Sequence, residues 1–125
     1  MGEIVRVTCS GCGQSWQCQR GCGVGHARLK NVITYFNDRT QAEIQEWAQG
    51  EDYPLFDFGF QPAGCEKCRD IVSVPVLHLG KSEKDYIGEC PKCGGVIKRE
   101  QMPPTLTCPI CGKQEFEILR ESLWD

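Results

Sequence analysis

Apolar and β-branched residues recur in short runs that predict strands along much of the chain. The first run leads directly into Cys9, and a second run just after it is suited to the returning strand. Two runs in the middle and two near the C-terminus have the same character, and the last two are predicted to be the arms of a hairpin. The predicted strands are residues 4–8, 15–18, 55–60, 70–79, 96–100 and 115–121.

Between the second and third predicted strands the apolar period becomes helical. An i, i+3, i+4, i+7 spacing is shared by four residues, which are Leu29, Val32, Ile33 and Phe36. This spacing predicts an amphipathic helix over residues 27–37. Thr40 and Glu43 form a capping box, which predicts a second helix over residues 41–49. Residues 26–50 are therefore expected to be a two-helix insertion.

Cysteine spacing indicates metal binding. Eight of the ten cysteines fall into four Cys-x-x-Cys pairs, which are Cys9/Cys12, Cys65/Cys68, Cys90/Cys93 and Cys108/Cys111. Two intervening residues let one tight turn direct both sulfurs at the same ion, so four pairs supply two closed tetrathiolate sites. The last two pairs read Cys-Pro-x-Cys-Gly, in which proline presets the turn and glycine permits a positive φ. We expect two zinc ions per chain, held by these eight cysteines.

The loop lengths favour one grouping of the pairs. Cys93 and Cys108 are separated by 14 residues, a length that closes a small β-hairpin. We therefore expect the last two pairs to form a self-contained zinc ribbon, and the first two pairs to share the other ion across the helical insertion. Loop closure becomes only slowly more costly with length, so this insertion is tolerable. Crossed pairing between the modules is the alternative.

The predicted fold class follows from these elements. It is a small metal-bound α+β protein with two zinc-ribbon β modules and a two-helix insertion in the first. The first module is predicted over residues 1–80, with the insertion at about 26–50, and the C-terminal ribbon over residues 81–125. The polar residues 81–85 are the predicted linker.

Cys18, Cys22 and His26 follow one another at equal spacing outside the four pairs. On a helix they would line one face and could form a third metal site with an open coordination position. Alternatively, the two cysteines are small buried apolar residues. We favour the structural interpretation because three glycines disfavour a continuous helix, namely Gly21, Gly23 and Gly25.

Charge and composition narrow the functional classes. The formal charge is −3, and eight thiolates with two Zn²⁺ ions would make it about −7, which disfavours binding to phosphate backbones. The sequence has neither a signal peptide nor an apolar run of about 20 residues, so we expect a cytoplasmic protein without a membrane span. It contains two histidines and no recognisable Ser/His/Asp set, so we expect no enzyme activity.

Three functions fit these features. The first is a cytoplasmic interaction module that zinc stabilises and whose partner is another protein. The second is a zinc ribbon that binds nucleic acid through interleaved basic and aromatic residues, namely Arg6, Arg20, Arg28, Lys30, Arg39, Trp16, Tyr35 and Phe36. The third is a rubredoxin-like electron-transfer protein, because four sulfurs can also hold iron.

Several motifs resemble those of small bacterial proteins with two zinc ribbons and no assigned activity. They are Cys9-Ser-Gly-Cys12-Gly, Gly21-x-Gly23, Cys65-Glu-Lys-Cys68, the two Cys-Pro-x-Cys-Gly turns and the final Leu123-Trp124-Asp125. The resemblance spans most of the chain but depends mainly on the cysteines. It implies two zinc sites built from the eight paired cysteines and implies no activity.

Overall fold

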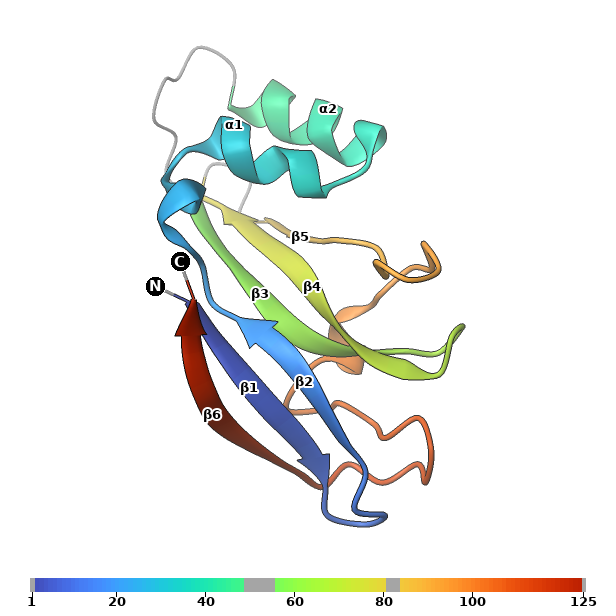
Figure 1. Ribbon diagram of the computed structural model, residues 1–125. Coiled ribbons are helices and arrows are strands. Elements are labelled where there is room, and N and C mark those ends of the chain that lie inside the picture. Colours follow the sequence, from blue (N-terminus) through green and yellow to red (C-terminus); the bar gives the residue numbers. More distant parts are fainter. Residues whose placement is uncertain (1, 49–55, 81–83, 125) are drawn as a thin grey trace.

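A computed structural model describes residues 2–48, 56–80 and 84–124 (Figure 1). The fold is α+β, with two three-stranded antiparallel sheets and two short α-helices. The first sheet has the order β2-β1-β6, formed by β1 (Gly2–Cys9), β2 (Ser15–Arg20) and β6 (Phe116–Trp124). The second has the order β3-β4-β5, formed by β3 (Phe56–Cys65), β4 (Asp70–Leu79) and β5 (Lys84–Ile87).

The first sheet joins the two ends of the chain. Strand β1 lies between β2 and β6 and pairs antiparallel with both, so the two ends of the described chain lie close together (Figure 1). Val5 and Val7 on β1 are fully buried and pack with Ile71 and Leu106. This burial fixes which face of β1 points inward, because a register slip of one residue would expose both valines.

The second sheet is dominated by the β3–β4 hairpin. Its register runs from the Phe56–Leu79 pair to the Cys65–Asp70 pair without a shift. An isolated bridge links this sheet to the first one: Gly21 donates to the Phe60 carbonyl at 3.0 Å, and Phe60 donates to the Gly21 carbonyl at 2.8 Å. The end of β2 is thereby fixed against β3.

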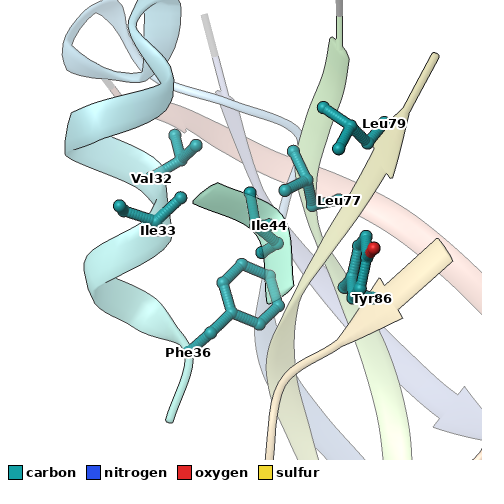
Figure 2. Close-up of a cluster of buried hydrophobic side chains, with 7 residues drawn as sticks. All are labelled: Val32, Ile33, Phe36, Ile44, Leu77, Leu79 and Tyr86. Atoms are coloured by element: carbon teal, nitrogen blue, oxygen red, sulfur yellow. The ribbon is translucent and has the colours of Figure 1, made fainter. Parts of the chain in front are cut away.

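The helices cover the upper end of the second sheet (Figure 1). Figure 2 shows their apolar side chains facing those of β4 and β5; the buried residues are Val32, Ile33, Phe36, Ile44, Leu77, Leu79 and Tyr86. Full burial of one such aliphatic side chain contributes about 1.5–3 kcal/mol. Packing against the sheet therefore stabilises helices that are too short to form alone.

The first predicted helix is interrupted. In place of one helix over residues 27–37, the chain forms a 3₁₀ turn (Val24–Ala27), helix α1 (Leu29–Val32) and a second 3₁₀ turn (Ile33–Tyr35). The spacing correctly identified the buried face, but the β-branched residues within it have modest helix propensity.

Helix α2 (Asp38–Trp47) begins three residues before the predicted start. Its N-cap is Asn37, whose side-chain oxygen accepts the Thr40 amide at 2.8 Å, so the predicted capping box at Thr40 is wrong. Asparagine caps at least as well as threonine, which favours the earlier start. The predicted helix end at Gln49 lies outside the described residues.

The predicted C-terminal hairpin is also wrong. Residues 96–98 form no strand and lead into a 3₁₀ turn (Arg99–Gln101), while β6 pairs with β1. Residue 97 is buried and residue 96 is 75% exposed, so this segment packs through Ile97 without extending a sheet. Strand β1 offers β6 a longer apolar partner.

The division into residues 1–80 and 81–125 remains a prediction. Residues 81–83 of the predicted linker lie outside the described residues, and Lys84 and Asp85 belong to β5. None of the helices within the described ranges is long and apolar enough to span a membrane.

Candidate metal centres

Eight cysteines form two compact tetrads. The β1–β6 tetrad consists of Cys9, Cys12, Cys108 and Cys111, and the β3–β4 tetrad consists of Cys65, Cys68, Cys90 and Cys93. Within each tetrad all four sulfurs lie within 4.8 Å of one another, and every cysteine is a free thiol. Each tetrad could therefore bind a metal ion, with ligands drawn from all four predicted Cys-x-x-Cys pairs.

The predicted grouping of these pairs is wrong. Cys9 and Cys12 meet Cys108 and Cys111, whereas Cys65 and Cys68 meet Cys90 and Cys93. The prediction considered only the loop between Cys93 and Cys108 and overlooked the pairing of β1 with β6, which brings the first and last cysteine pairs together. The crossed alternative is the one found, so there is no self-contained C-terminal cysteine site.

Three of the four cysteine turns share one backbone geometry. The first cysteine donates its N–H to the carbonyl five residues later at 2.8–2.9 Å, and its own carbonyl accepts the amide of the glycine four residues later at 2.8–3.0 Å. That glycine has a positive φ of 79°, 70° or 77°, at Gly13, Gly94 and Gly112 respectively. The sequence signal of glycine after the second cysteine thus has a direct structural cause.

The fourth turn departs from this pattern. Arg69 follows Cys68 and has a φ of 54°, in the left-handed region that non-glycine residues seldom occupy. The turn joins β3 to β4, and the Cys65–Asp70 pair holds its two ends in register. The strand pairing therefore imposes a backbone conformation that disfavours arginine.

The sulfur separations match tetrahedral coordination. Between the turns of the β1–β6 tetrad, Cys9 and Cys111 are separated by 3.5 Å and Cys12 and Cys108 by 3.8 Å. The equivalent distances in the β3–β4 tetrad are 3.5 Å and 3.7 Å. A zinc–sulfur bond of about 2.3 Å gives tetrahedral sulfur–sulfur edges of about 3.8 Å.

Two turns of the β1–β6 tetrad approach each other closely at one glycine. A Cβ atom at Gly11 would lie 3.3 Å from the Cys111 sulfur and 2.5 Å from Cδ of Lys113. A larger residue would push the two turns apart or displace the lysine chain. Gly11 therefore helps to set the separation between the sulfurs.

The two tetrads differ in exposure. The first cysteine of each Cys-x-x-Cys turn is buried; these residues are Cys9, Cys65, Cys90 and Cys108. The second residues are exposed in the β1–β6 tetrad and half-buried in the β3–β4 tetrad. An ion in the β1–β6 tetrad would consequently be the more accessible to solvent.

Each tetrad contains one thiol that ionises readily. The Cys12 backbone amide, aided by neighbouring thiols, lowers the pKa of Cys9 to about 7. Burial raises the pKa of Cys65, but the Cys68 amide and the adjacent thiols outweigh that effect and bring the pKa to about 7.

Other thiols in each tetrad resist ionisation in the absence of metal. Burial and the neighbouring sulfurs raise the pKa of Cys68 to about 12. For Cys111, the Lys113 amide lowers the pKa, but burial and the neighbouring thiols raise it to about 11. A divalent cation removes this mutual repulsion, so metal binding is coupled to proton release.

Lys92 lies beside the β3–β4 tetrad. Lys92 contacts the Asp70 carboxylate, and this contact, together with the nearby Cys68 and Cys90, raises the lysine pKa. A positive charge here partly offsets the net negative charge of a metal held by four thiolates. The sequence places Lys92 between the two ligands of a Cys-Pro-x-Cys turn, but it gave no signal for the Asp70 contact.

Cys18, Cys22 and His26 do not form a third centre among the described residues. Cys18 is buried with Val5 and Val7. The His26 Nδ1 accepts the Gly23 amide at 2.9 Å, and its Nε2 lies 3.1 Å from the Tyr35 hydroxyl. Both imidazole nitrogens therefore have protein partners, and Cys18 has the apolar environment expected of a structural cysteine.

A cavity of about 560 Å³ lies between the two tetrads. Its lining includes Cys65 from one tetrad and Cys108 from the other. The Gln101 side chain donates to the Gly64 carbonyl at 2.6 Å and accepts the Lys98 amide at 2.8 Å. These bonds satisfy the side chain of the buried glutamine, which lies in the cavity wall.

Comparison with known proteins adds no assignment. No family model matches the chain, and neither the curated proteins nor the solved structures include a match.

Proposed function

We propose that this chain is a cytoplasmic binding module stabilised by zinc, that it has no catalytic activity, and that its partner is another protein. Each tetrad holds one Zn²⁺ ion in this proposal, giving two ions per chain and two interleaved zinc ribbons. The observation that carries the proposal is the closure of both sites by four sulfurs at tetrahedral separations. Such a site supplies folding energy and leaves no coordination position for a substrate.

The arrangement of acid–base groups supports a role without catalysis. In the part of the chain that the structure describes, the two tetrads are the only clusters of three or more His, Cys, Asp or Glu side chains that could hold a metal. His26 and His78 are both engaged, the first with Gly23 and Tyr35 and the second with Asp85 at 2.7 Å. Among these contacts, neither histidine meets the side chain of a serine, threonine or cysteine.

Binding to nucleic acid is less well supported. Two of the basic residues considered for it are paired with carboxylates: Arg6 with Glu121 at 3.1 Å and Arg20 with Glu3 at 2.7 Å. Phe36, considered for base stacking, is buried in the core under the helices. The ion pairs offset positive charge, and the burial of Phe36 removes aromatic surface that nucleic acid would need. We therefore favour a protein as the binding partner.

Elemental analysis of the purified chain tests the metal assignment. We expect two zinc ions per chain, a colourless protein, and loss of dispersed amide NMR signals when a chelator removes the metal. The free state of all ten cysteines is consistent with a reducing compartment, where zinc thiolates persist. A red protein containing iron would support the rubredoxin-like alternative, and a native NMR spectrum after chelation would refute zinc-dependent folding.

A further inference from the structure

A groove of about 560 Å³ lies between β2 and β4, on the side of β2 that faces away from β1. Three β2 residues line it, Trp16, Gln17 and Gln19, and β4 contributes Ile71 and Ser73 to the opposite wall. The volume is typical of a site that holds a ligand or a short peptide segment. We refer to it as the β2–β4 groove.

The backbone of β2 is only partly satisfied along this groove. Alternate residues of a strand direct their N–H and C=O groups to one neighbour and the intervening residues to the other side. Gln19 donates its amide to Ser73 Oγ at 2.8 Å, and Gly21 exchanges both bonds with Phe60, so the odd-numbered residues point away from β1. The same alternation directs the N–H and C=O groups of Ser15 and Gln17 outward.

Neither Ser15 nor Gln17 has a backbone partner on that side within the described part of the chain. The first sheet therefore has an open edge that begins just where the bonds to Ser73 and Phe60 end. An incoming strand could continue the ladder from that point. From Ser15 to Gln17 the open edge is about 7 Å long at about 3.3 Å per residue, which suits a segment of roughly three residues.

The walls of the groove indicate which segment would fit. Trp16, Tyr35 and Phe60 give it aromatic surface, and Tyr35 is 46% exposed. The two charged residues in the lining, Asp70 and Lys92, pair with each other. Apolar side chains on one face of an extended segment would meet the aromatic wall, and a net charge on the segment would find no unpaired partner.

We propose that the β2 edge binds an uncharged extended segment of a partner protein, with apolar residues at alternate positions, as an added antiparallel or parallel strand. Backbone hydrogen bonds to Ser15 and Gln17 would supply affinity, and contacts with Trp16 and Phe60 would select side chains. This inference names the partner surface of the proposed binding module and therefore depends on that function.

The opposite edge of the same sheet is less suitable. Strand β6 has a register irregularity opposite Ile4 and Val5, and its exposed residues there include Arg120 and Glu121. Irregular pairing and charged side chains protect sheet edges from added strands. The β2 edge has neither charged residue nor irregularity between Ser15 and Gln19, which makes it the receptive edge.

Selection from a displayed library of random peptides, using the zinc-loaded chain as bait, tests this inference. Enriched peptides should be uncharged and alternately apolar, and should shift the NMR amide signals of Ser15 and Gln17. Gln17→Pro should weaken their binding at least tenfold, because proline removes an outward N–H that the β1 ladder does not use. Arg120→Pro on the β6 edge is the matched control and should bind the same peptides as the native chain does.

A second measurement does not depend on how the variants fold. In a selected peptide, alternate backbone amides would face β2 and the intervening amides would face away from it. N-methylation of the amides that face β2 should abolish binding. The inference is overturned if a folded chain with two zinc ions enriches no such peptide, if Gln17→Pro binds equally, or if N-methylation has no effect. A chain that holds no zinc would instead refute the proposed function.

Discussion

The sulfurs of Cys9 and Cys111 lie 3.5 Å apart although the two residues are 102 positions apart in sequence. A metal ion at this point would fasten the beginning of the chain to its end. The adjacent β1–β6 pairing runs from Cys9–Phe116 to Gly2–Trp124, so binding of a metal here would be coupled to closure of the first sheet. An ion in the second tetrad would fasten the β3–β4 turn to the segment after β5 in the same way.

Cys108→Ser should open the β1–β6 tetrad and leave the other tetrad intact. We expect the zinc content to fall from two ions to one and the amides of β1 and β6 to exchange faster with solvent. Structural zinc can contribute about 10 kcal/mol or more to small domains, so the variant should lose a large part of the stability of this sheet.

Cys68→Ser is the matched variant for the other tetrad. It should also retain one zinc ion, but its fastest new exchange should appear at the β3–β4 turn, near residues 65–70. Equal loss of protection in both sheets for both variants would show that the tetrads do not act on separate parts of the fold. Hydrogen exchange followed by NMR makes the comparison.

Arg69→Gly should stabilise the chain by about 1 kcal/mol, because a left-handed conformation costs a non-glycine residue about 1–2 kcal/mol and glycine recovers most of this despite its entropy. Gly94→Ala is the converse control at the same position of another cysteine turn. A Cβ atom there meets nothing within 4 Å, so its cost would come from the backbone alone. Thermal unfolding at fixed zinc concentration measures both; destabilisation by Arg69→Gly would contradict the strain argument.

Replacing Cys18 and Cys22 together with alanine should leave the zinc content at two ions. Cys18 is buried in an apolar cluster, so the change should cost on the order of 1 kcal/mol through lost contacts. Elemental analysis and chemical denaturation report the two quantities. Loss of one zinc equivalent would mean that these cysteines bind metal after all.

His26 should titrate below its ordinary pKa of 6.5, because burial disfavours the charged imidazolium. The folded state then binds this proton less readily than the unfolded state, so stability is fully present above 6.5 and is lost as the pH falls through the lower folded value. The Gly23 amide donates to Nδ1, which places the neutral proton on Nε2. An imidazole NMR titration with a midpoint at or above 6.5 would contradict this environment.

The sequence predicted local features better than long-range pairing. Two-residue spacing between cysteines and the following glycines indicated the tight turns, and the apolar spacing of Leu29 to Phe36 indicated the face that packs on the sheet. Strand β4 also begins and ends as predicted. Each of these features depends on residues within a few positions of one another.

Which strands pair with each other depended on residues that are far apart in the sequence. From the sequence, strand β6 could have paired with residues 96–100 or with β1. Residues 96–100 were favoured because they are nearer to β6 in the sequence. In the structure β6 pairs with β1, whose Val5 and Val7 are buried against Ile71 and Leu106, and that pairing determines which cysteines meet. The predicted grouping of the cysteine pairs was based on the lengths of the loops between them. The cost of closing a loop varies only slowly with its length, so loop length could not outweigh the pairing of the strands that the loops connect.

The interleaved grouping of the cysteines is the central claim, and substitution of NMR-active cadmium for zinc tests it most directly. Through-bond correlations should connect one cadmium to the β-protons of Cys9, Cys12, Cys108 and Cys111, and the other to those of Cys65, Cys68, Cys90 and Cys93. A cadmium signal that correlates with both Cys90 and Cys108 would contradict the account.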